Sequence, residues 1–132
     1  MNVICRFATA IGYPQTVPAE RQEFTFIVDG GEMRALDLGN RLVLTREISR
    51  EEDDVPRLAA YAPGRILRED AALYWDGYCG AVKLAQEIPA DATGNELKVF
   101  FETFADSCDW WLSRAAAEPA CPVSFPGMAI RP

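Results

Sequence analysis

The 132-residue sequence contains no histidine, which removes the commonest general acid–base side chain of enzymes. The same absence excludes a serine or cysteine nucleophile that is activated by histidine. The phosphate-binding pattern G-x-x-x-x-G-K-[ST] is missing, and neither Gly30-Gly31 nor the segment 77–80 has the spacing of a dinucleotide-binding loop. We therefore expect a protein that is not an enzyme and that holds no cofactor.

The cysteines are few and poorly spaced for a metal. Cys5, Cys79, Cys108 and Cys121 form no C-x-x-C pair, and without histidine they cannot complete an ordinary zinc site. We expect no metal and free, partly buried thiols, as in a reducing compartment. A basic and apolar leader is also missing, as is an apolar run of the roughly 20 residues that cross a membrane. The sequence thus predicts a cytoplasmic protein that does not insert into membranes.

The charge balance is acidic, with 20 aspartates and glutamates against 13 lysines and arginines and a formal net charge of −7. A negative surface repels phosphate backbones, so nucleic acid and anionic membranes are not expected partners. The simpler interpretation is that this charge keeps the protein soluble. The densest acidic run, residues 51–54, fits a solvated turn that leads into a helix, because acids complement the start of a helix dipole.

Hydrophobic spacing predicts an α+β protein with one domain, residues 1–118, and a proline-rich extended tail, residues 119–132. The expected elements, in chain order, are a helix over 3–13, strands over 23–28, 32–38 and 41–48 that form an antiparallel meander, a short helix from 55 that Pro63-Gly64 ends, a hairpin of strands 71–76 and 81–88, and a long helix up to 117.

Three local signals fix the element boundaries. Asp29-Gly30 marks a tight turn between the first two strands. Asp53 or Asp54 is expected to cap the short helix. The segment 93–96, Thr-Gly-Asn-Glu, fits a capping box, and apolar residues then recur every three or four positions, as in an amphipathic helix. We interpret the aromatic stripe of this last helix as packing rather than as a ligand site.

The order and local sequence of these elements resemble the class I type III secretion chaperones, also called the Tir-chaperone-like family. Residues 24–30, FTFIVDG, look like the first strand of the family with its Asp-Gly turn. Residues 73–89 are similar to its fourth and fifth strands, residues 97–112 look like its last helix, and residues 11–14 are similar to the end of its first helix. The resemblance covers residues 1–117, and Pro63-Gly64 departs from it, because the family has a longer second helix.

The resemblance implies a homodimer in the bacterial cytoplasm that binds the N-terminal region of a cognate secreted effector, keeps it soluble and secretion-competent, and hydrolyses no ATP. A regulatory alternative uses the same fold to sequester another protein and so control expression of the secretion system. A third hypothesis is a small enzyme or ligand-binding domain that shares only the strand order and uses carboxylates such as Asp29, Asp76 or Glu87.

Two sets of apolar residues are candidates for contacts with partners. An antiparallel sheet can accept an extended chain along an edge and on an uncovered face. The alternative for both sets is that they form the core of the monomer. The effector-binding candidates are Phe7, Ile11, Phe24, Phe26, Val28, Leu42 and Leu44, and the dimer-interface candidates are Leu58, Tyr61, Ile66, Leu73 and Trp75.

Overall fold

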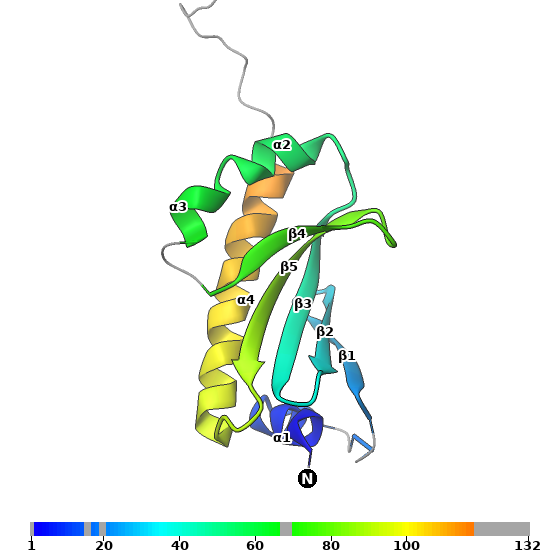
Figure 1. The fold of residues 1–132 in the computed structure, drawn as a ribbon, viewed down its shortest axis with the longest axis vertical. Helices are drawn as coiled ribbons and strands as arrows, with labels where there is room; N and C mark the ends of the chain where they lie inside the picture. The colour runs from blue at the N-terminus through cyan, green and yellow to red at the C-terminus, as the bar shows by residue number, and fades with distance from the viewer. Residues whose placement is uncertain (1, 15–16, 19–20, 67–69, 118–132) are drawn as a thin grey trace, which may run out of the picture.

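A computed structural model of the chain describes residues 2–14, 17–18, 21–66 and 70–117, so the expected tail after 118 lies outside the described residues. The α+β fold class predicted from the sequence is confirmed, with one additional helical segment (Figure 1). The elements are α1 (Val3–Ala10), β1 (Glu23–Val28), β2 (Gly31–Asp37), β3 (Arg41–Ser49), α2 (Asp54–Ala59), α3 (Ala62–Ile66), β4 (Ala72–Asp76), β5 (Ala81–Pro89) and α4 (Gly94–Ala116).

The strands form one antiparallel sheet of five strands in the order β1-β2-β3-β5-β4. The first three strands are the expected meander. The hairpin of β4 and β5 joins it through its second strand, because β5 pairs with β3 over almost the whole length of both strands. As a result β1 and β4 are the two edges of the sheet, at opposite ends of the strand order.

Two of the local signals form as predicted. Asp29 and Gly30 both take positive φ values, 50° and 80°, which is the two-residue turn that suits the twist of a hairpin. At the start of α4, the Thr93 hydroxyl accepts from the Glu96 backbone N–H, and the Glu96 carboxylate accepts from that of Thr93. This capping box satisfies two backbone donors that the first turn leaves without helical partners.

Two predictions about the short helix were wrong. Pro63-Gly64 does not end the helical region but lies inside α3, where a proline in the first turn sacrifices no helical hydrogen bond. Asp53 precedes α2 without a side-chain capping bond. Asp54 instead accepts from the Ser49 hydroxyl at 2.7 Å and from the Arg57 guanidinium at 2.8 Å.

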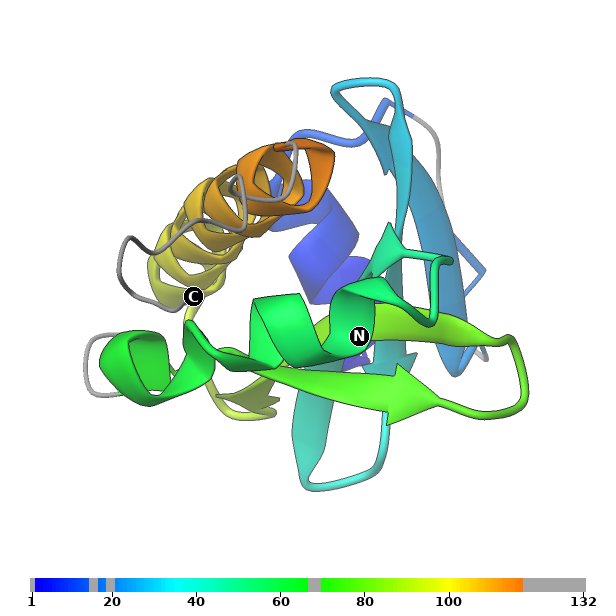
Figure 2. The same cartoon turned by 90° about the horizontal axis from the view of Figure 1, so that it is seen from above.

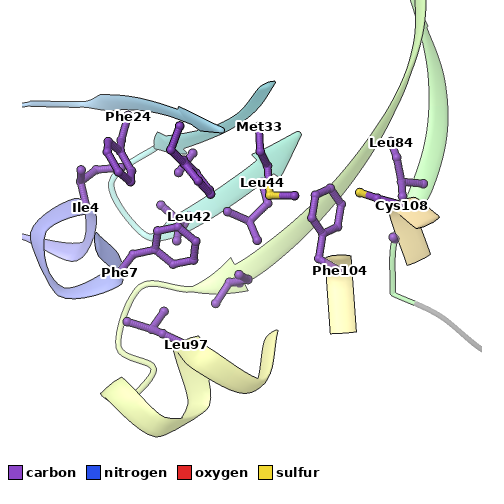
Figure 3. Packing of buried hydrophobic residues seen from close by; sticks show 14 of the residues in the cluster. Ile4, Phe7, Phe24, Met33, Leu42, Leu44, Leu84, Leu97, Phe104 and Cys108 are labelled. Carbon is purple, nitrogen blue, oxygen red and sulfur yellow. The ribbon is translucent and has the colours of Figure 1, made fainter. Parts of the chain in front are cut away.

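The core lies between one face of the sheet and the helices α1 and α4, which Figure 2 shows on the same side. Side chains from the sheet, α1 and α4 converge in Figure 3, where Phe104 of α4 points toward the sheet. The alternation along β1 and β3 puts Phe24, Phe26, Leu42 and Leu44 on the covered face. Because the described helices cover only this face, the opposite face is open and mostly polar.

Candidate partner-binding surfaces

The backbone of β1 is one open surface. Within the described residues β1 pairs only with β2, and Asp37 N–H donates to the Gln22 carbonyl at 2.8 Å just beyond that pairing. Backbone groups in an antiparallel pair point alternately toward and away from the partner strand. The N–H and C=O groups of Glu23, Thr25 and Ile27 therefore point away from β2, toward the open edge.

The two aromatic side chains of β1, in contrast, are hidden. Phe24 and Phe26 are only 6% and 5% exposed and stack with ring centroids 4.9 Å apart. Tyr13 meets the ring of Phe24 edge-on at 4.7 Å, and Phe7 of α1 lies 5.8 Å from Phe26. These contacts hold β1 against α1 and its following turn, so the edge offers its backbone to a partner but not its two phenylalanine rings.

A groove of about 290 Å³ runs beside this edge. Its walls include Tyr13, Val17 and Arg21 from the connection between α1 and β1, and Phe24 and Thr25 from the strand itself. The groove therefore has apolar and polar walls next to the unpaired backbone, which is the combination that an extended polypeptide uses.

The opposite edge, β4, exposes side chains as well as backbone. Trp75 is 43% exposed and Tyr74 39% exposed. The register places Trp75 opposite the buried Val82, and therefore on the face that the helices cover elsewhere. Trp75 lies where this cover ends, so the core face of the sheet continues into solvent at β4.

The α2–α3 segment lies beside β4 and is tied to the end of α4 (Figure 2). Arg57 donates to the carbonyls of Arg114 and Ala115 in the last turn of α4, at 2.7 and 3.2 Å, and the Arg114 carbonyl also accepts from the Ala117 backbone N–H at 3.3 Å. The same guanidinium also holds the pKa of Asp54 below its usual value, with help from the Ser49 hydroxyl. Tyr61, 41% exposed, packs edge-on against Trp110 at 5.6 Å.

The turn between β4 and β5 is held by Asp76. Its carboxylate accepts from the Lys83 ammonium at 2.9 Å and from the backbone N–H groups of Tyr78 and Cys79 at 3.0 and 3.3 Å. These donors, Lys83 first, lower the pKa of Asp76 to about 2, and Asp76 raises the pKa of Lys83. The exposed Tyr78 at the tip is thus carried on an ordered turn.

The structure places the predicted effector-binding residues mainly in the core. Ile11 and Val28 are partly buried, whereas the other five lie in the core between the sheet and the helices α1 and α4: Phe7, Phe24, Phe26, Leu42 and Leu44. A partner that contacted those five would have to displace a helix. Their role in effector binding stays a prediction.

The predicted dimer residues divide into two groups. Leu58 is fully buried in the monomer core, and Leu73 is partly buried and packs against this core. Tyr61 and Trp75 are exposed. Ile66 ends α3, and its side chain lies outside the described part of the chain.

Sequence reasoning did not select two exposed residues of the edge strands, Tyr74 and Ile27. Ile27 could have been found, because it is an isoleucine at an outward position of β1, 68% exposed, and it interrupts the polar pattern that such a face usually has.

The carboxylates of the enzyme hypothesis do not converge. Asp76 binds Lys83, and Glu87 lies 3.6 Å from Arg41. Asp76 pairs with Ala81, and Ala81 and Glu87 are separated by about 20 Å at the usual rise of a strand. Across the described residues no cluster of three or more metal-ligating side chains occurs, and none of the described helices has both the length and the apolar character to cross a membrane.

Solved structures with the same architecture decide the fold. The chain matches one in the HopA1–SchA chaperone–effector complex with a TM-score of 0.68 and 18% identity, over 84% of this chain and 91% of the other. The chain has the class I type III secretion chaperone fold. A chain of the ExsC–ExsE complex shares this fold with a TM-score of 0.61 and 24% identity, over 84% and 89% of the two chains.

The type III secretion chaperone SycH of Yersinia pestis, solved with a fragment of YscM2, also shares the chaperone fold. Its TM-score is 0.58 at 14% identity, over 83% of this chain and 96% of the other. No protein-family model and no curated protein matches the sequence. At these identities the likeness lies in the fold, and it confirms the fold predicted from the sequence.

Proposed function

We propose that this protein is a type III secretion chaperone, which binds the N-terminal region of a secreted effector and keeps it soluble and secretion-competent without ATP hydrolysis. The observation that supports this most directly is the open backbone of β1 within a chaperone fold. Hydrogen bonds from a strand edge recognise an extended backbone whatever its side chains. An effector segment held in this way is prevented from folding or aggregating.

We propose in addition that the protein is a homodimer joined along β4 and the α2–α3 segment. Exposed aromatic side chains are enriched at interfaces, and here Trp75 and Tyr74 of β4 and Tyr61 of the α2–α3 segment are all about 40% exposed. An open strand edge beside them supplies backbone pairing for a second copy. Light scattering behind size exclusion tests this, with an expected mass near twice 14.6 kDa. A strict monomer at high concentration contradicts the dimer but leaves the chaperone proposal standing.

The chaperone proposal is tested by co-expression. Each candidate effector of the native host is produced with this protein, once at full length and once without its N-terminal segment. We expect the full-length effector to stay soluble and to co-purify stably, and the shortened one to do neither. Equal binding of the two forms would refute the proposal, because the contact would then not involve the secreted N-terminal region.

The regulatory alternative stays a prediction, since the same fold serves both roles. The acidic surface argues against direct contact with DNA, so regulation would act through a protein partner. Deleting the gene and measuring transcripts of the secretion system separates the two roles. Unchanged transcript levels would remove the regulatory one.

A further inference from the structure

A cluster of aromatic and arginine side chains lies where the α2–α3 segment meets the last turns of α4. Tyr61 packs edge-on against Trp110 and Trp111, with ring centroids 5.6 and 6.5 Å away. The Arg114 guanidinium lies 5.7 Å from the ring centroid of Tyr61 and 4.5 Å from that of Trp110. The guanidinium of Arg65 lies 4.0 Å from the Trp110 centroid. We refer to these side chains together as the Tyr61–Trp110 surface.

Part of this surface is open to solvent. Trp111 is buried in the core, but Tyr61 is 41% exposed and Trp110 is only partly buried. Aromatic rings that are held in place and open on one side bind proline-rich segments in the polyproline II conformation. The backbone carbonyls of such a segment have no internal hydrogen bonds, so they can accept from the N–H donors of a guanidinium. The Tyr61–Trp110 surface offers both the rings and the guanidinium groups.

The chain itself supplies a proline-rich segment shortly after this surface. Of the 14 residues from 119 to 132, four are proline and only one, Arg131, is charged. Charged residues make up 25% of the whole chain, so this stretch lacks the charge that keeps a disordered tail solvated. Proline also fixes φ near the polyproline II value and removes a backbone donor, which disfavours a helix or a central strand. The composition therefore favours an extended segment that rests against another surface.

The apolar residues of this segment follow the period of a polyproline II helix, which has three residues per turn. Positions 119, 122, 125 and 128 are Pro, Pro, Phe and Met, so in that conformation they share one face. In a strand, whose side chains alternate, the same four residues would be divided between two faces. Pro119 and Pro122 also form a P-x-x-P pattern, which is the pattern that aromatic surfaces recognise.

The end of α4 brings the segment to this surface. Ala117 is the C-cap residue of α4, three positions after Arg114, whose guanidinium lies over the ring of Tyr61. Trp110 precedes Ala117 by seven residues, which is about 10 Å along the helix axis. A polyproline II segment advances about 3.1 Å per residue, so Pro122 lies up to about 16 Å from Ala117. A segment that folds back over the end of α4 therefore reaches the exposed rings.

We propose that residues 119–128 of this chain dock on the Tyr61–Trp110 surface, with Pro119, Pro122 and Phe125 facing the rings. Arg114 then donates to the free carbonyls of the segment. Because the segment is tethered, its effective concentration at this surface is far above that of a separate polypeptide, which favours the chain's own tail over that of a second copy. The inference goes beyond effector binding at β1, and it borders the proposed dimer surface only at Tyr61.

The experiment places a spin label on the tail of the full ¹⁵N-labelled chain through Ser124→Cys and reads the paramagnetic relaxation enhancement of the Trp110 indole Nε–H. The buried Cys108 is kept, and the other three cysteines are first replaced by serine: Cys5, Cys79 and Cys121. We expect a strong enhancement at Trp110 and none at the Gly94 amide, which starts α4 roughly 34 Å from Ala117. Equal enhancement at both positions would refute docking.

Two tyrosine variants separate docking from mere proximity of the tail. Tyr61→Ala removes the exposed ring, and we expect the enhancement at Trp110 to fall at least fivefold, because the label then moves away from the surface. Tyr78→Ala removes the fully exposed tyrosine of the β4–β5 turn and should leave the enhancement unchanged. A tail that does not dock gives the same enhancement in both variants, and that result would overturn the proposal. Light scattering of each variant reports the dimer separately.

A matched pair of tail variants tests the face that docks and leaves the described domain unaltered. Phe125→Ser removes a residue of the proposed contact face, and we expect at least a fivefold loss of enhancement. Val123→Ser changes an apolar residue off that face and should have little effect. Equal losses would refute the polyproline II register. A mixture of spin-labelled ¹⁴N chains and unlabelled ¹⁵N chains should show no enhancement, and broadening there would assign the tail to a second copy instead.

Discussion

The two edges of the sheet occupy equivalent positions in the strand order but differ in what they offer to a partner. At β1 the aromatic side chains are buried against α1, and the backbone is what the edge presents. At β4 the aromatic side chains Tyr74 and Trp75 are themselves exposed. Backbone pairing tolerates many sequences, whereas an aromatic surface requires a matching one. The comparison suggests that β1 serves varied extended partners and β4 a constant partner, a second copy of the chain.

The largest expected effect tests whether β1 is anchored by its side chains. Phe26→Ala removes a buried ring that contacts Phe7, Phe24 and Phe101, and should lower the free energy of unfolding by about 3–5 kcal/mol. The matched control is Ile27→Ala, one residue along and 68% exposed, which should change it by less than about 0.5 kcal/mol. Urea unfolding at one fixed protein concentration measures both. Equal losses would show that the two faces of β1 are not as different as their burial indicates.

The next effect concerns β4. Trp75→Ser should weaken the homodimer by about 2–4 kcal/mol, roughly 30- to 1000-fold in Kd, because the twofold symmetry counts each loss twice. The monomer should stay folded, since Trp75 is only partly buried. Sedimentation equilibrium gives the dissociation constant. Val99→Ser, which changes an exposed apolar residue of α4, is the control and should leave it unaltered. A dimer that survives Trp75→Ser places the interface elsewhere.

A smaller effect tests the open backbone of β1. Thr25→Pro removes one N–H from the free edge and leaves the pairing with β2 intact, so effector affinity should fall about tenfold, the value of roughly one backbone hydrogen bond. Thr25→Val keeps the N–H and removes only the hydroxyl, and should bind normally. The effector segment identified by co-expression is the ligand for calorimetry. Unchanged affinity in the proline variant would exclude strand addition at this edge.

The smallest effect concerns the ordered turn that ends β4. The pKa of Asp76 is about 2 in the folded protein against 3.8 for an unperturbed aspartate, so its pairing with Lys83 stabilises the fold above pH 3.8 and is lost as the pH falls toward 2. Asp76→Asn should therefore lower the urea midpoint slightly at neutral pH, and the difference should vanish across that window. A difference that persists below the window would assign the effect to the backbone hydrogen bonds of the turn rather than to charge.

The sequence predicts those parts of the fold that local chemistry determines. Asp29-Gly30 and the Thr93–Glu96 capping box were identified correctly because each signal is complete within four residues. Pro63-Gly64 was misjudged because a proline stops a helix or starts one according to its position in the first turn, which the pattern alone does not give.

The surfaces were harder to predict than the fold. Alternation along β1 separates Phe24 and Phe26 from Thr25 and Ile27, but it cannot say which face the helices will cover. That choice depends on α4, some 70 residues later in the chain.

Arg57 also bears on the order in which the molecule is completed. Its acceptors, the carbonyls of Arg114 and Ala115, are among the last described residues to leave the ribosome. Since a chain is synthesised from its N-terminus, α2 is fixed in place only after α4 has been made as far as Ala115. Among the described elements, α2 is thus fixed late although it is made early, and a chain that ends before Arg114 lacks the carbonyls that hold α2 beside β4.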